Sequence, residues 1–358
     1  MCAVESAAVP APGVSFSELD DAKVNRFQIK VMFVSGMGFF TDAYDLFVIG
    51  VVVSILKTQW HLSTDQVSLL SSATLGASAI GAIIFGRVAD ILGRKRIYGY
   101  EVLILAAGAI ASALAPSIAW LVAFRIVLGI GIGGDYPVSA TIMSEYSGKS
   151  SRGRMVSLVF AMQAAGLVVG PLIAVILLAA GISHDLVWRL LLGLGAIPGL
   201  AVYYLRRQIH ETPRFAMAGG ASDEAQAAIA QATGKAPPSP GPVRESVARH
   251  RQTAMEGFRT LFTNRRLVMW LIGGAGAWFM LDFSYYGNTI ASPEIIKLIS
   301  SHASLSHSTL ITLLIFVVAA VPGYALAILL IDRMGRRSIQ TLGFTVMAVM
   351  FGLIGLDG

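Results

Sequence analysis

Charged residues and cysteine are scarce in this chain. Asp, Glu, Lys and Arg supply 13% of the 358 residues and hydrophobic residues supply 55%, whereas an average soluble domain carries about 25% charged residues. The one cysteine, Cys2, excludes an intrachain disulfide and a zinc site built on cysteines. Together with a mean hydropathy of +0.69, this composition indicates a membrane protein.

A signal peptide is also missing, because residues 1–27 are mixed polar residues with no apolar run behind a charged start. The net charge of +6 and the pI of about 9.5 would suit a protein that binds nucleic acid. The basic residues cluster instead at the ends of apolar stretches, where Lys and Arg anchor helices at a membrane surface. We therefore expect the lipid bilayer as a partner and no nucleic acid.

Long apolar stretches are abundant. A helix that crosses a bilayer needs about 20 mostly apolar residues, and nine stretches qualify: 29–56, 69–88, 97–115, 118–142, 155–180, 187–205, 267–290, 308–331 and 339–356. Lys and Arg concentrate between spans two and three, four and five, and eight and nine, so these loops and the N-terminus are expected on the cytoplasmic side. Nine spans exclude a soluble enzyme, and no catalytic site, metal site or cofactor is expected.

The spans fall into two groups, which predict the domain organisation. Four segments result: 1–28, a cytoplasmic N-terminal segment; 29–205, a six-helix bundle; 206–266, a cytoplasmic loop; and 267–358, an incomplete second bundle of three spans. Within the loop, the Ala-, Gln- and Pro-rich segment Ser222–Pro242 is expected to be mobile. The segment Val247–Phe262 is expected to form a basic amphipathic helix on the membrane surface.

Four carboxylates lie inside the apolar stretches: Asp42, Asp45, Asp135 and Asp282. A carboxylate at membrane depth costs about 2.5 to 3.5 kcal/mol unless it is paired, hydrated or protonated, so each one is a candidate functional residue. Because they are distributed over three separate spans, they favour a pathway for protons or a solute over a membrane anchor. Alternatively, Asp42 and Asp45 could cap a break in the first helix, and Asp135 could simply accept a hydrogen bond from Tyr136 or a neighbouring helix.

A short loop motif occurs twice in the chain. Residues 90–95 (DILGRK) and residues 332–337 (DRMGRR) both fit the pattern D-x-x-G-R-[KR], six spans apart. Glycine permits a tight turn, and the acidic and basic side chains can pair across the helix ends. Ordinary positive-inside anchoring would explain one copy, whereas two copies at this interval favour a duplicated six-helix unit.

This motif resembles the loop signature of the major facilitator superfamily, and the resemblance covers nearly the whole chain. It implies an all-α membrane protein of the major facilitator fold, with twelve helices in two six-helix bundles. Since only nine spans are predicted, the last three helices are expected to be missing, either because the chain is a fragment or because the reading frame ends early. Such a chain is expected to insert into the membrane and not transport by itself, whereas transport is expected of the whole twelve-helix protein.

Two longer runs are similar to those of the phosphate:proton symporters of fungi, plants and some bacteria. They are Gly36–Phe47 (GMGFFTDAYDLF) in span one and Gly133–Thr141 (GGDYPVSAT) in span four. In span seven, Trp278, Asp282 and Tyr286 resemble the W-x3-D-x3-Y phosphate triplet of that family, and their spacing places them on one helix face. The asparagine that the family's site draws from helix 10 is absent from nine spans.

The resemblance implies three sets of functional residues. The phosphate-binding set is Asp135, Tyr136, Gln163, Trp278, Asp282 and Tyr286. The proton-coupling set is Asp42, Asp45, Glu101 and Asp135. The gating set is Asp90, Arg94, Glu145, Arg152, Asp332 and Arg336. Within it, the pairs Asp90–Arg94 and Asp332–Arg336 are expected to latch an outward-facing state.

Several of these residues have a plainer interpretation. Trp278 and Tyr286 could belong to an interfacial aromatic belt, and Gln163 could merely join two helices. Glu101 could extend to the cytoplasmic surface. The run Gly129–Gly134 fits G-x-G-x-x-G, but no strand precedes it, so dinucleotide binding is rejected.

The sequence therefore predicts a multi-pass transporter of a cell membrane, plasma or bacterial inner, that takes up inorganic phosphate with protons. Phosphate near neutral pH keeps a proton that it can donate to Asp282, whereas sulfate has none and would be repelled. A proton-coupled carrier of a sugar or organic ion is the alternative, because residues 210–215 (HETPRF) resemble a run that sugar porters share. A second alternative is a protein that does not transport, either a sensor or a truncated form.

Overall fold

The computed structural model describes residues 17–218, 222–234, 254–299 and 304–357. Within these ranges the chain is helical and contains no strand. The elements are, in chain order, α1 (Ser17–Asp20), α2 (Arg26–Gln59), α3 (Thr64–Leu92), α4 (Arg94–Ile97), α5 (Tyr100–Ala113), α6 (Ile118–Tyr146), α7 (Arg152–Ala179), α8 (His184–Leu194), α9 (Ala196–Arg207), α10 (Pro213–Ala218), α11 (Ser222–Thr233), α12 (Ala254–Thr263), α13 (Arg265–Ile299), α14 (Leu305–Ile315), the π-helical turn η1 (Phe316–Ala320), α15 (Val321–Met334) and α16 (Arg336–Asp357).

The ends of the first two long helices follow from their local sequence. Asn25 begins α2 with a capping box, in which its side chain accepts from the N–H of Gln28 at 2.9 Å and the Gln28 side chain accepts from the N–H of Asn25 at 3.3 Å. Ser63 and Gln66 cap the start of α3 in the same way. Helix α3 ends at Gly93, whose φ of +100° suits glycine and strains other residues.

Eight helices of the described part are long and apolar enough to cross a membrane, and they confirm the first eight predicted spans. The sixth span consists of α8 and α9, which meet at Gly195. The ninth predicted stretch lies in α16, which is not among these eight helices, so the ninth span stays a prediction.

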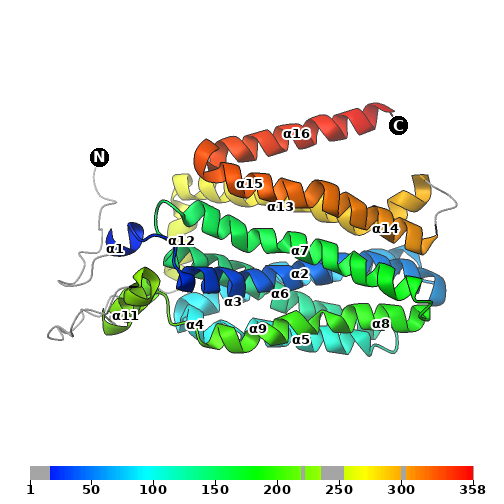
Figure 1. Cartoon of the computed structure of the whole chain (residues 1–358), viewed down its shortest axis with the longest axis horizontal. Helices are drawn as coiled ribbons and strands as arrows, with labels where there is room; N and C mark the ends of the chain where they lie inside the picture. The colour runs from blue at the N-terminus through cyan, green and yellow to red at the C-terminus, as the bar shows by residue number, and fades with distance from the viewer. Residues whose placement is uncertain (1–16, 219–221, 235–253, 300–303, 358) are drawn as a thin grey trace.

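The spans lie side by side along the longest axis of the molecule (Figure 1). Helix α2 is the most enclosed, and every residue from Thr41 to Leu56 is buried. It packs against α6, α7, α8 and α9, while α3 packs on α6, and α5 packs on α6, α8 and α9. Helices α2–α9 are called the first bundle below, and α13–α16 the second group. In Figure 1, α16 lies at the outer edge of the molecule.

The second group meets the first bundle through three helices. Helix α7 contacts α14 and α15, and α2 contacts α13. Aromatic rings fill part of this junction: the Phe47 ring stacks on that of Tyr286 at 5.8 Å between centroids and meets that of Phe316 at 6.0 Å. Polar side chains near this junction are therefore placed between the two groups of helices.

The expected mobility of Ser222–Pro242 is wrong for its first half, because Ser222–Thr233 forms α11. Ala225, Ala228 and Ala232 are fully buried on this helix. Alanine is the strongest helix former, and its small side chain lets α11 pack against α1, α2 and α10. The Nδ2 of Asn25 donates to the carbonyl of Ala232 at 2.6 Å, which fixes the loop helix to the start of α2.

The remaining loop predictions are tested only in part. Residues 235–242 lie outside the described residues. So do residues 247–253, the first part of the predicted amphipathic helix. The rest of that helix is present as α12, and its place on a membrane surface stays a prediction.

Candidate functional site

Four acidic residues predicted for proton coupling are buried in the first bundle. Asp42 and Asp45 lie on α2, Glu101 on α5 and Asp135 on α6, and none of them is more than 1% exposed. A buried carboxylate needs a counter-charge, hydrogen bonds or a proton. The four acids meet this need in three different ways, which separates their possible roles.

Asp135 and Glu101 share one arginine that sequence reasoning missed. Arg206, on α9, is fully buried. Its Nη1 and Nη2 donate to the two carboxylate oxygens of Asp135 at 2.8 and 3.0 Å, and Nη1 also donates to Glu101 Oε1 at 2.9 Å. Charge-assisted bonds in this bidentate form are the strongest that side chains make. One cation thus ties α5, α6 and α9 together.

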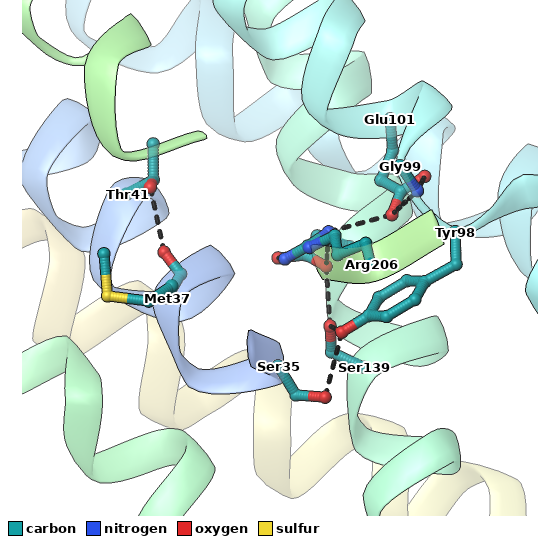
Figure 2. A network of polar contacts seen from close by, with 9 residues as sticks. Ser35, Met37, Thr41, Tyr98, Gly99, Glu101, Ser139 and Arg206 are labelled. Atoms are coloured by element: carbon teal, nitrogen blue, oxygen red, sulfur yellow. Dashed lines mark hydrogen bonds and ion pairs between the residues drawn. The ribbon is translucent and has the colours of Figure 1, made fainter. Parts of the chain in front are cut away.

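The ion cluster of Arg206, Asp135 and Glu101 is completed by one aromatic ring and three hydroxyl groups, as Figure 2 shows. The Arg206 guanidinium lies 4.5 Å from the centre of the Tyr98 ring. Ser139 donates to Asp135 at 2.6 Å, and the Tyr98 hydroxyl lies 2.9 Å from that of Ser35 on α2. The cluster is therefore held from α2 as well, and its ions are surrounded by polar partners instead of lipid.

Gly38 allows the ion cluster to reach the surface of α2. A Cβ atom at this position would overlap Asp135 Oδ2 and Arg206 Nη2, so only glycine leaves room for the pair. Asp42 lies one turn further along the same face of α2. It is close enough to interact electrostatically with Asp135, Arg206 and Tyr136.

Among the four buried acids, Asp42 is the one with neither a hydrogen bond nor an ion pair within the described part of the chain, whereas Asp45, whose oxygens also lack hydrogen bonds, lies 4.0 Å from Arg125. Among the described residues, neither carboxylate oxygen of Asp42 has a hydrogen-bond partner, although the side chain is fully buried. An ionised carboxylate is unstable in such a place, whereas the neutral acid is tolerated. The geometry thus marks Asp42 as the acid of this region that is most suited to hold a proton.

Asp45 lies beside a second buried arginine that sequence reasoning missed. Arg125 Nη1 is 4.0 Å from Asp45 Oδ1, and Arg125 Nη2 donates to the Asp45 backbone carbonyl at 3.1 Å. Both side chains are fully buried. An arginine inside an apolar stretch is itself a signal of function, and this signal was present in span four.

A chain of polar side chains crosses the junction between the first bundle and the second group. Gln163 Nε2, on α7, donates to the hydroxyl of Tyr136, on α6, at 2.7 Å. The Tyr136 hydroxyl lies 3.1 Å from that of Tyr286, on α13. Tyr324, on α15, donates to Gln163 Oε1 at 3.0 Å. Three of the six predicted phosphate-binding residues are thus directly linked. Tyr324 belongs to the same chain of bonds, although the sequence analysis did not name it.

The other three predicted phosphate-binding residues lie apart from this chain of bonds. Asp282 is half-buried on α13, one turn after Trp278 and one turn before Tyr286. The Trp278 ring is 49% exposed and meets that of Phe160 at 6.2 Å between centroids. Asp135 is directed to Arg206, although it is the neighbour of Tyr136 in sequence. The binding roles of all six residues remain predictions.

The predicted gating residues form a second set of ion pairs at the helix ends. Arg94 lies 3.6 Å from Asp90 and 3.4 Å from Glu145. Arg152 pairs at 3.1 Å with Asp20, a residue that sequence reasoning did not single out. The Arg94 contacts connect α3 and α4 to the end of α6, and the Arg152 pair connects the start of α7 to α1.

The pairing of Asp332 differs from the expected one. Its carboxylate lies 3.8 Å from Arg154 on α7 instead of being paired with Arg336 on its own loop. The physical reason is the packing of α7 on α15, which brings Arg154 to the end of α15. This contact joins the first bundle to the second group.

Comparison with known proteins gives concordant results. Residues 31–358 match the family described as "Sugar (and other) transporter". The chain is 33% identical to inorganic phosphate transporter 1-11 of rice, over 94% of this chain and 69% of that protein. It is 34% identical to the inorganic phosphate transporter PHO84 of Saccharomyces cerevisiae, over 96% and 66%. The chain spans about two thirds of the length of these curated relatives.

Solved structures match at the level of the fold. A partially occluded, inward-open structure of the xylose transporter XylE from E. coli has a TM-score of 0.63 and 19% identity, over 87% of this chain and 74% of that one. A bacterial homologue of the lysosomal transporter Spinster has a TM-score of 0.56 and 18% identity, over 88% and 63%.

Proposed function

Because the chain belongs to the sugar (and other) transporter family of the major facilitator superfamily, we propose that the whole protein carries inorganic phosphate into the cell together with protons. The family consists of transporters and not enzymes, and the eight apolar helices make the chain an integral multi-pass membrane protein. The named phosphate transporters among its relatives support the choice of substrate.

The observation that carries the proposal is the polar chain between the two groups of helices. Tyr136, Gln163 and Tyr286 offer hydroxyl and amide donors, which are what the oxygens of a phosphate anion require. Asp282 lies one turn from Tyr286 and can accept a hydrogen bond from the P–OH group that phosphate keeps near neutral pH. Sulfate offers no such proton, so the same carboxylate would repel it.

The buried acids supply a route for the coupling proton. Asp42 is the acid without a partner, and it lies next to both the ion cluster and Tyr136. A proton that enters would neutralise Asp42, and its release would create a charge that Arg206 is close enough to attract. Asp135 and Glu101 already share Arg206, so the three acids compete for one cation. Asp45, paired with Arg125, would take part in a separate step of proton transfer.

The rest of the cycle follows the general scheme of transporters built from two bundles. The two groups of helices would rock about the site at their junction and expose it to each side in turn. The Arg154–Asp332 pair joins them at one end and would break when that end opens. We place this end, with the N-terminus, on the cytoplasmic side of a plasma or bacterial inner membrane, because the basic loops gather there.

The test is uptake of radiolabelled phosphate by the whole protein in proteoliposomes, with and without an inward proton gradient. The expected result is uptake that rises with the gradient, collapses with a protonophore and is competed by arsenate. Neither sulfate nor xylose should compete. Uptake of xylose in place of phosphate would favour a sugar carrier. Phosphate uptake that is unaffected by a protonophore would contradict the proposed proton coupling.

A further inference from the structure

Tyr324 occupies a position in the polar chain that no sequence motif indicated. Its hydroxyl donates to Gln163 Oε1 at 3.0 Å, and Gln163 Nε2 then donates to the Tyr136 hydroxyl at 2.7 Å. The Tyr324 hydroxyl lies close enough to that of Tyr285, on α13, to interact with it electrostatically. The bond between Tyr324 and Gln163 links α15 to α7, and so the second group to the first bundle.

The orientation of the Gln163 amide decides which groups the site presents. An amide has a donor end and an acceptor end, and the two can exchange by a half-turn of the side chain. With Oε1 held by Tyr324, Nε2 faces Tyr136, and the Tyr136 proton stays free to be donated onward to Tyr286 or to a bound anion. In the opposite orientation Tyr136 would donate to Gln163, and this chain of donors would point away from Tyr286.

The backbone before Tyr324 departs from a regular helix. Residues Phe316–Ala320 form the π-helical turn η1, and Pro322 follows in the first turn of α15. π-helical turns inside α-helices are rare and occur often at functional sites. Because this turn is wider than an α-helical one, it changes the direction in which the next residues project. Tyr324 lies two residues beyond Pro322, on the segment that this change affects.

We propose that Tyr324 is a positioning residue of the anion site, which holds the Gln163 amide with its N–H groups towards Tyr136 and the substrate. The inference rests on the proposed function, since it concerns the same phosphate site. It adds that affinity for an anion depends on a residue that acts through Gln163. A neutral ligand would accept either amide orientation and would not require Tyr324.

The experiment is a double-mutant cycle on phosphate binding and uptake. Kd for radiolabelled phosphate and the KM and maximal rate of uptake would be measured for the wild type, Tyr324→Phe, Gln163→Met and the double variant. We expect Tyr324→Phe to raise Kd roughly five-fold. This follows from the loss of one hydrogen bond of about 1 kcal/mol, since about 1.4 kcal/mol corresponds to a tenfold change in Kd. The change should appear in KM and leave the maximal rate unaltered.

The cycle separates positioning from a direct or purely structural role. In the Gln163→Met background, adding Tyr324→Phe should cause no further loss, because no amide is left to orient. Tyr204→Phe removes a hydroxyl from an exposed residue of α9 and serves as the matched control, with wild-type binding expected. Equal losses in both backgrounds, or wild-type binding by Tyr324→Phe, would overturn the inference while leaving the proposed function intact. Failure of the wild type to bind phosphate would overturn the proposed function itself.

Discussion

The contact of the ion cluster with α2 leads to a sharp prediction for Gly38→Ala. The added methyl group would overlap one oxygen of Asp135 and one nitrogen of Arg206. Both are held in a bidentate pair at 2.8 and 3.0 Å inside the protein, so neither can move aside into solvent. Either α2 shifts away from α6, or the pair separates.

The size of the effect follows from the burial of this pair. Separating a buried ion pair costs about 3–5 kcal/mol, because the charges lose their partners in a place without water. In an exposed helix, by contrast, alanine in place of glycine gains about 1 kcal/mol. Gly38→Ala should therefore destabilise the protein although the substitution favours the helix. Weakening of the pair should also release Arg206 and impair proton coupling.

The assay compares thermal unfolding in detergent and gradient-driven phosphate uptake for Gly38→Ala and a matched control. Gly86→Ala on α3 is that control, because a Cβ atom there would meet nothing within 4 Å. The control should melt at or slightly above the wild-type temperature. If Gly38→Ala melted like the control and kept coupled uptake, the close approach described here would be irrelevant to stability and function.

Three further predictions concern single side chains. Asp42→Asn should abolish gradient-driven accumulation of phosphate and spare exchange of phosphate at equilibrium, measured in the same proteoliposomes; loss of both together would contradict a role limited to the proton. Asp282→Asn should weaken phosphate binding by about 1.5–3 kcal/mol, roughly 10- to 150-fold, and let sulfate compete, and continued exclusion of sulfate would count against this account of selectivity. Arg154→Ala should change the free energy of unfolding by less than about 1 kcal/mol, since the pair with Asp332 is partly exposed, but it should slow phosphate uptake. The double variant Arg154→Asp with Asp332→Arg should restore the wild-type uptake rate, and failure to do so would argue against a gating pair.

Much of the architecture follows from the sequence because membrane spans are set by length and hydropathy alone. Eight of the predicted stretches match described helices that could cross a membrane. The burial of Asp42, Asp45 and Asp135 follows in the same way, from their depth within apolar runs. Hydropathy says nothing of what a buried group touches, so neither the ion cluster nor the chain of tyrosines could be derived from it.

The residues that the sequence analysis missed show what hydropathy and motifs cannot predict. Arg206 and Arg207 both end an apolar stretch, as anchoring residues do, but only Arg206 is buried. A helical wheel would have placed Arg206 with Gly199 and Val202, which are buried too. Tyr324 carries no charge and fits no motif, and its position depends on the π-helical turn before it. No pattern used in the sequence analysis indicates such a turn.

One further consequence lies in the order of residues on α6. Asp135 bonds to the ion cluster and Tyr136 to the chain of tyrosines, so a single peptide unit joins the two sites. Pro137 comes next and removes the N–H that would bond to the carbonyl of Gly133, which loosens the helix at this point. A small axial rotation of α6 would displace both side chains at once relative to their partners. Proton binding and substrate binding would then be coupled directly through the backbone of α6, without other residues between the two sites.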